Sequence, residues 1–288
     1  SGGAAIADTG VIRMASGTTL DLTGSSEAIG LLSNNTAGGT VTSSAGGAVT
    51  VTTGVEANST FAGVIQDGSG TVALTKQGSG VFTLSGANTF SDGLTIKAGT
   101  VLGTSVAANA FGTGTITLGD SAGGSNAATL LVGTTGLTYA NAIALAPLTT
   151  GTLSIGNSGN IAALTFSGGV TGANDLTINN TSTGASTITL STAAVNNTGK
   201  VTNIGTSTGA TTISAAVGGN VTEIIENSTT SALTVSGPVT TTGSKTFRNA
   251  SGGSLLTISG AVTGTGTVVL DNDSTLANGV TVSAGGIN

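Results

Sequence analysis

Acidic residues are the side chains best able to do chemistry in this chain, because the sequence contains no histidine and no cysteine. The absence of histidine excludes a Ser-His-Asp triad and most zinc sites. The twelve acids are dispersed along the chain, whereas enzymes that cleave polysaccharides gather several carboxylates on one face. We therefore expect no enzyme, and keep a carbohydrate-cleaving enzyme only as the weakest alternative.

The closest acidic pair is Asp271 and Asp273, in the turn 270–274. Carboxylate and amide oxygens bind Ca²⁺, so this pair is a weak calcium candidate. A full set of about six oxygen ligands is not visible around it, which favours a solvated turn. The Gly-x-Gly pairs are interpreted as turn glycines, because the sequence has no Gly-x-x-x-x-Gly-Lys-Ser/Thr phosphate loop. We expect no cofactor.

The most regular feature of the sequence is a row of asparagines in its second half. Successive members are separated in the numbering by 23, 23, 24, 22 and 23. They are Asn157, Asn180, Asn203, Asn227, Asn249 and Asn272. A fixed period in the twenties, carried by strand-forming residues, is typical of a β-solenoid, in which each turn of chain stacks on the previous one.

Each of these asparagines leads, after a turn rich in Ser, Thr and Gly, to a strand with alternating apolar residues. The expected strands span 164–170, 188–195, 212–217, 233–239, 256–262 and 280–286. Thr, Val and Ile favour a pleated, half-buried surface. Aligning 142–148 with 233–239 places the two prolines, Pro147 and Pro238, in one column, which would be a corner because proline lacks a backbone N–H.

The asparagine row has two interpretations. In the structural one it is a ladder, in which stacked side-chain amides bond up and down the column. In the functional one it carries glycans, because Asn180, Asn227, Asn249 and Asn272 each begin an Asn-x-Ser/Thr triplet. Such triplets arise by chance in a sequence rich in Ser and Thr, so the ladder is favoured.

The same alignment predicts stacked ion pairs on the outer face. Glu226, Arg248 and Asp271 each stand one residue before a member of the asparagine row, and follow one another at separations of 22 and 23. Glu223 and Lys245 are likewise separated by 22. Exposed pairs of this kind contribute only about 0–1 kcal/mol each, so they would test the alignment more than they would stabilise the fold.

A stretch in the first half resembles a known family. Residues 74–90 read Leu-Thr-Lys-Gln-Gly-Ser-Gly-Val-Phe-Thr-Leu-Ser-Gly-Ala-Asn-Thr-Phe, and residues 93–101 read Gly-Leu-Thr-Ile-Lys-Ala-Gly-Thr-Val. This sequence closely resembles the passenger-associated transport repeat of bacterial autotransporters, with Phe90 and Val101 in place of the usual Tyr and Leu. The resemblance implies a right-handed parallel β-helix displayed on a cell surface, and no particular activity.

Together these patterns predict an all-β, right-handed parallel β-helix with about 23 residues per turn. We expect one solenoid over 1–288: irregular early turns or a cap at 1–62, the family-like part at 63–132 and regular turns at 133–288. The six cations are scattered and the net charge is −6, so nucleic acid is not an expected partner. No apolar run reaches the ~18 residues of a membrane helix, so this segment is not expected to insert in a membrane.

The complete lack of cysteine fits a protein exported through the periplasm to the outside of a bacterial cell. The leading expectation is a non-enzymatic structural or adhesive β-solenoid on the cell surface, whose partner would be a host-surface or matrix ligand. The alternative is a subunit that self-associates head to tail into a filament or surface layer, because open solenoid ends carry unpaired strand edges.

Overall fold

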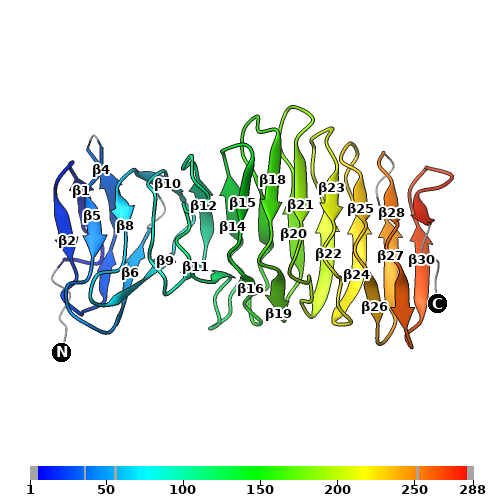
Figure 1. Cartoon of the computed structure of the whole chain (residues 1–288), viewed down its shortest axis with the longest axis horizontal. Helices are drawn as coiled ribbons and strands as arrows, with labels where there is room; N and C mark the ends of the chain where they lie inside the picture. The colour runs from blue at the N-terminus through cyan, green and yellow to red at the C-terminus, as the bar shows by residue number, and fades with distance from the viewer. Residues whose placement is uncertain (1–5, 36, 55–56, 251–252, 284–288) are drawn as a thin grey trace. The chain divides into compact units, whose positions relative to one another are not determined.

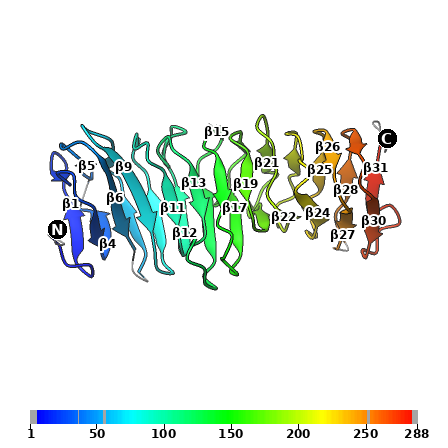
Figure 2. The ribbon, with the colours of Figure 1, turned by 90° about the horizontal axis from the view of Figure 1, so that it is seen from below.

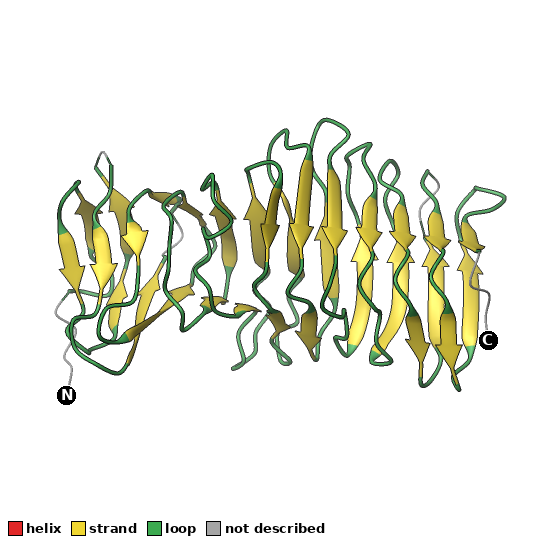
Figure 3. Cartoon of the chain, in the orientation of Figure 1, coloured by secondary structure: helices red, strands yellow, loops and turns green. Residues whose placement is uncertain are grey.

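The structure, a computed structural model, describes residues 6–35, 37–54, 57–250 and 253–283. Within these ranges the chain forms strands, turns and loops, and no helix there could span a membrane (Figure 3). Neighbouring strands are parallel, and positions one repeat apart lie opposite each other, as Ala48 and Thr71 or Leu233 and Leu256 do. The predicted all-β parallel β-solenoid is confirmed.

The chain forms two compact units. The first comprises residues 1–134 with 148–151, and the second comprises residues 135–147 with 152–288. Each is described by itself below.

In the first unit, parallel sheets are formed by β1–β4, by β2–β5–β8, by β3–β6–β9–β11–β13 and by β7–β10–β12–β14. Figure 2 shows β6, β9, β11 and β13 following one another in one of these sheets. The strands are β1 (Val11–Met14), β2 (Thr19–Asp21), β3 (Glu27–Ile29), β4 (Leu31–Asn34), β5 (Thr40–Thr42), β6 (Ala48–Thr53), β7 (Ser59–Phe61), β8 (Val64–Ile65), β9 (Thr71–Lys76), β10 (Val81–Leu84), β11 (Leu94–Ile96), β12 (Gly99–Gly103), β13 (Ile116–Leu118) and β14 (Ala128–Val132).

In the second unit, one sheet runs β15–β18–β21–β23–β25–β28–β31 and another runs β17–β20–β22–β24–β27–β30. The strands of the first of these lie in a row in Figure 1. The pairs β16–β19 and β26–β29 belong to a third wall. The strands are β15 (Leu137–Tyr139), β16 (Ile143–Leu145), β17 (Leu153–Asn157), β18 (Ala163–Phe166), β19 (Val170–Gly172), β20 (Leu176–Asn179), β21 (Thr187–Leu190), β22 (Gly199–Asn203), β23 (Thr211–Ile213), β24 (Val221–Glu226), β25 (Leu233–Val235), β26 (Val239–Thr241), β27 (Lys245–Asn249), β28 (Leu256–Ile258), β29 (Val262–Gly264), β30 (Val268–Asn272) and β31 (Val280–Val282).

The core of each unit is built from columns of inward side chains, because successive residues of a strand point to opposite faces. In the first unit Leu94 stacks between Leu74 and Ile116, and all three are fully buried. In the second unit a column of valines follows the small residues at the corners, from Val170 to Val262. Full burial of such side chains contributes about 1.5–3 kcal/mol each, which a single turn could not obtain alone.

The strands expected after the asparagines are present as β18, β21, β23, β25, β28 and β31. Residues 284–286, the end of the last expected strand, lie outside the described residues. The prediction that Pro147 and Pro238 share one column is wrong. Ile143 stands in the column of Val239, so Pro147 follows that column by four residues whereas Pro238 precedes it by one.

Candidate functional site

A row of buried polar side chains in the second unit is the first candidate site. Asn157 is the last residue of β17 and Asn180 directly follows β20, on the neighbouring rung, and both are fully buried. The Asn157 Nδ2 donates to Asn180 Oδ1 at 2.6 Å and to Ser186 Oγ at 2.9 Å. The Asn180 Nδ2 donates to the Ser186 carbonyl at 2.6 Å. This pair forms one step of an amide ladder.

A second buried column contains a carboxylate. Asn203, Glu226, Asn249 and Asn272 are Cα partners on β22, β24, β27 and β30. The Asn203 Nδ2 donates to Glu226 Oε2 at 2.9 Å, and the Asn249 Nδ2 donates to the carbonyls of Ser254 and Gly279, both at 2.7 Å. Asn203, Glu226 and Asn249 are fully buried, whereas Asn272 is exposed.

This register differs from the expected ladder at two places. Asn203 lies opposite Ile178, which precedes Asn180 by two residues, so Asn180 and Asn203 both point inward but do not stack. The position two residues beyond Asn203 is Gly205, where an added Cβ would come within 2.9 Å of the Asn180 Cβ. The prediction that Asn227 belongs to the ladder is wrong. Glu226 occupies the column, and a shift of one residue turns Asn227 to the exposed face.

These positions also bear on the glycan interpretation. Asn180 and Asn249 are buried with their amide nitrogens engaged, so the folded chain leaves no space for a sugar on either. Asn227 and Asn272 are exposed.

We expect Asn249→Ala to destabilise the chain by about 2 kcal/mol, because it leaves the buried Ser254 carbonyl without its donor and removes one of the two donors to the Gly279 carbonyl. The matched control is Asn227→Ala, at an exposed position in the same predicted row, which should change the free energy of unfolding by less than about 0.5 kcal/mol. Urea unfolding of both variants measures the difference. Equal effects would contradict the register in which Glu226, and not Asn227, joins the column.

Glu226 is the most perturbed acid. Its Oε1 accepts the Ser228 N–H at 2.6 Å and its Oε2 accepts the Asn203 amide, and both bonds favour the ionised form. Removal from water outweighs them and raises the pKa of Glu226 from 4.5 to about 8. The predicted ion pair of Glu226 with Arg248 is wrong, because Arg248 lies opposite Ile225 and points outward.

One outer ion pair, that of Arg248 with Asp271, joins Cα partners on neighbouring strands. Arg248 lies opposite Asp271, with its Nε 3.5 Å from the Asp271 Oδ2. Its Nη2 lies 2.5 Å from the Asp273 Oδ2. The weak calcium candidate thus consists of two carboxylates that share one guanidinium. In the described part of the chain, no group of three or more acidic, His or Cys side chains gathers as a metal site.

The predicted pair of Glu223 with Lys245 is also wrong. Glu223 lies opposite Lys200 on the preceding rung, and its Oε2 is 2.8 Å from the Lys200 Nζ. Lys245 points into the core, where its Nζ donates to the carbonyls of Gly218, at 3.2 Å, and of Val221. Burial lowers the pKa of Lys245 to about 8.

Lys76 in the first unit is a second buried lysine that the sequence analysis did not single out. Its Nζ donates to the carbonyls of Gln77 at 2.8 Å, Gly78 at 2.6 Å and Ala98 at 3.3 Å. Burial lowers its pKa to about 8 as well. The alternation of the strand could have revealed it, since Lys76 follows the inward residues Val72 and Leu74 at the same spacing of two.

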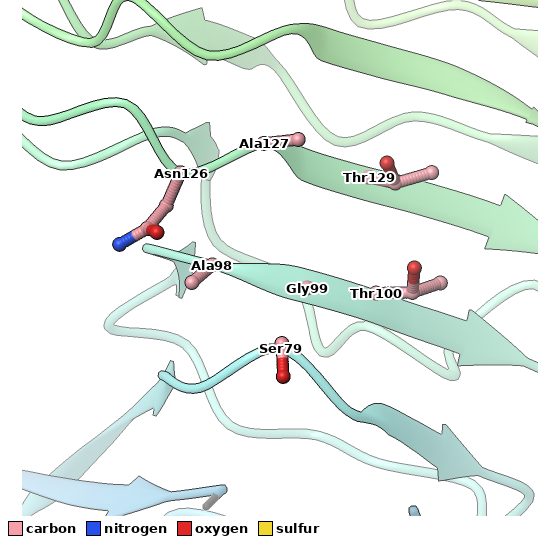
Figure 4. Close-up of a pocket in the computed structure, with 7 residues that line it drawn as sticks. All are labelled: Ser79, Ala98, Gly99, Thr100, Asn126, Ala127 and Thr129. Atoms are coloured by element: carbon pink, nitrogen blue, oxygen red, sulfur yellow. The ribbon is translucent and has the colours of Figure 1, made fainter. Parts of the chain in front are cut away.

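The first unit has an open groove of about 300 Å³ beside the starts of β12 and β14. It forms where Gly99 lies opposite Ala128, because the loop before β14 makes this turn longer than its neighbours. Its lining offers hydroxyls and one amide but no ionisable side chain, so it can hydrogen-bond a neutral polar ligand without acid–base chemistry. The lining residues are Ser79, Ala98, Gly99, Thr100, Asn126, Ala127 and Thr129 (Figure 4).

Comparison with known families gives one match at two places. The passenger-associated transport repeat matches residues 74–102 and 262–288. The first match runs from β9 into β12 and contains Lys76, and it overlaps the stretch whose resemblance is described above. The second begins at β29 and was not predicted. No curated protein and no protein of solved structure gives a significant match.

Proposed function

We propose that this chain is a non-enzymatic structural or adhesive segment of a bacterial autotransporter passenger, displayed on the outside of the cell. The observation that carries the proposal is the presence of two passenger-associated transport repeats within stacked parallel strands. Repeats of this family together with a β-solenoid fit such a passenger. In this role the chain holds loops and grooves away from the membrane, and dense backbone pairing resists proteases.

The structural roles of the acids support a non-enzymatic role. Asp67 accepts the N–H groups of Val72 and Ser91, and Asp175 accepts the N–H of Lys200. Hydrogen bonds from Ser44 and Thr23 lower the pKa of Asp21. Carboxylates used in this way close turns and connect successive rungs. The neutral groove beside β12 and β14 is the surface best suited to a host-surface or matrix ligand.

A display experiment tests the proposal. The chain is fused upstream of the membrane barrel of a well-characterised autotransporter, and intact cells are treated with a protease and labelled with an antibody against the chain. We expect surface labelling and a protease-resistant fragment that spans the solenoid. The same barrel carrying no passenger is the control.

Two results would overturn the proposal. One is retention of the chain inside the cell while the control barrel inserts normally. The other is cleavage of polysaccharides by the purified chain in a broad substrate panel, which would favour the enzymatic alternative.

The filament alternative rests on a different observation. Leu270 belongs to the inward column of Phe247, yet it is 52% exposed on β30. A further rung, from a second copy or from a continuation of the chain, would bury it. Electron microscopy of the same purified chain separates the alternatives, since polymers of even width favour the filament and dispersed particles favour the displayed segment.

A further inference from the structure

The turn that joins β30 to β31 contains two neighbouring residues that can react with each other. Asn278 is followed by Gly279, and this is the only Asn-Gly step in the sequence. Asn278 is exposed, and among the described residues its side-chain amide has no hydrogen-bond partner. Figure 2 shows β30 and β31 at the C-terminal end of the ribbon. The Asn278 carboxamide is therefore free to rotate toward the backbone that follows it.

The geometry of this turn requires glycine at position 279. The Asn272 side chain closes the turn, because its Nδ2 donates to the Leu276 carbonyl at 2.8 Å and its Oδ1 accepts the Ser274 hydroxyl at 2.7 Å. A Cβ added at Gly279 would lie 2.2 Å from that Oδ1. A larger residue would displace the Asn272 amide, so the closed turn keeps a residue without a side chain directly after Asn278.

A glycine in this position favours attack of its own nitrogen on the asparagine side chain. Because glycine has no Cβ, the Gly279 nitrogen can approach the Asn278 Cγ without a steric clash. In the described chain this nitrogen donates to the Leu276 carbonyl of the same turn at 3.2 Å, which is at the long end of the range for hydrogen bonds. The attack therefore breaks no hydrogen bond between rungs at this nitrogen.

Asn227 is also exposed but lacks both of these conditions. It is followed by Ser228, which is buried and whose backbone N–H donates to the Glu226 Oε1 at 2.6 Å. The Ser228 nitrogen is thus bonded to a carboxyl oxygen and shielded by its own side chain. Asn227 therefore provides an internal comparison, in the same chain and under the same conditions, for the reactivity of Asn278.

We propose that Asn278 is a site of spontaneous deamidation. The Gly279 nitrogen bonds to the Asn278 Cγ, the bond from Cγ to Nδ2 breaks, and ammonia leaves with the proton that the Gly279 nitrogen gives up. The product is a five-membered succinimide ring. Water then opens the ring at Cγ to give aspartate, or at the backbone carbonyl carbon of the same residue to give isoaspartate. Water is the only co-reactant, and nothing is oxidised or reduced.

Isoaspartate at position 278 weakens the contact of β31 with the preceding rung. It carries the chain through its Cβ and Cγ, which adds one atom to the main chain directly before Gly279. The Gly279 carbonyl accepts the Leu256 N–H at 2.9 Å and the Asn249 Nδ2 at 2.7 Å, and both bonds are lost when Gly279 is displaced. This inference goes beyond the proposed surface display and does not depend on it.

Ageing of the purified, folded whole chain at mildly alkaline pH tests the proposal. Peptide mass spectrometry follows the conversion of each asparagine, and labelling by an isoaspartyl methyltransferase reports the rearranged product. Hydrogen exchange at the Leu256 amide reports whether the last described rung has opened. Asn278→Gln is the matched control, because its longer side chain cannot close a five-membered ring. The same chain aged in urea gives the rate without the fold.

We expect the folded chain to lose the Asn278 amide before conversion at Asn227 is measurable, and the Leu256 amide to lose its protection as isoaspartate accumulates. Asn278→Gln should retain that protection over the same period. Conversion of Asn278 in urea but not in the folded chain would overturn the proposal, as would equal rates at Asn278 and Asn227. Equal loss of protection in Asn278→Gln would overturn the inferred effect on β31.

Discussion

Replacing Glu226 with glutamine is expected to remove the fall in stability that the wild-type chain shows between about pH 4.5 and about pH 8. Burial raises the pKa of Glu226 from 4.5 to about 8, so in this window the folded chain holds a proton that the unfolded chain releases. Stability is therefore greatest below the unfolded pKa and decreases as the pH rises through the folded value. One pKa unit corresponds to about 1.4 kcal/mol, so the expected decrease from pH 4.5 to pH 7 is about 3 kcal/mol.

Urea unfolding of the whole chain at pH 5, 6, 7 and 8 measures this slope. Glu226→Gln keeps the shape and the acceptor for the Asn203 amide without a titrating proton. Glu223→Gln is the control at an outward position of the same strand, where the carboxylate contacts Lys200, and it should retain the wild-type slope. The same slope in wild type and Glu226→Gln would show that the buried carboxylate is not its source.

Replacing Gly260 with alanine is expected to destabilise the second unit by about 3 kcal/mol or more through overpacking. A Cβ at Gly260 would lie 1.9 Å from the Gly237 carbonyl oxygen, and one at Gly237 would lie 2.0 Å from that of Ala215. These corners sit directly over one another, and the obstacle is backbone that cannot rotate away. The Gly260 N–H is also bonded to the Val235 carbonyl at 3.2 Å, which holds the glycine in place.

Gly243→Ala is the matched control, because an added Cβ there has no atom within 4 Å. It should be neutral or stabilising by up to about 1 kcal/mol, since alanine restricts the unfolded chain more than glycine does. Thermal melts of the two variants beside wild type provide the comparison. If Gly260→Ala melts together with Gly243→Ala, the corners are not as closely stacked as the structure indicates.

The fold was predictable because each turn repeats the same alternation of apolar and polar residues. The strands after the asparagines were placed from that pattern alone. The face of the sheet to which each side chain points was harder to predict, because a shift of one residue moves every side chain to the other face. Lys200 with Glu223 and Arg248 with Asp271 stand at the full repeat distance and pair. The predicted pairs that stand one position short of that distance do not form.

The buried column of Asn203, Glu226 and Asn249 was predicted only in part. The prediction followed the residue type, asparagine, more closely than the separation between successive positions. Asn227 was chosen because it is an asparagine, although Glu226 stands midway in the numbering between Asn203 and Asn249. The turn between Ile178 and Asn203 is longer, and it has an irregularity at Gly199 and Lys200. The spacing of the asparagines in the sequence does not indicate this extra length. Turns of unequal length are absorbed in loops, where the sequence carries no alternation to count.

The primary amines of the lysine side chains differ widely in their exposure to solvent. Lys97 and Lys200 have side chains 40% and 47% exposed, whereas Lys76 and Lys245 are about 1% exposed and enclosed by backbone carbonyls. A reagent that acylates amines from water reaches the first two directly. It reaches the other two only when their corners open, and each buried amine then loses the charge that held those carbonyls. Acylation at Lys76 or Lys245 would thus prevent an opened corner from closing again.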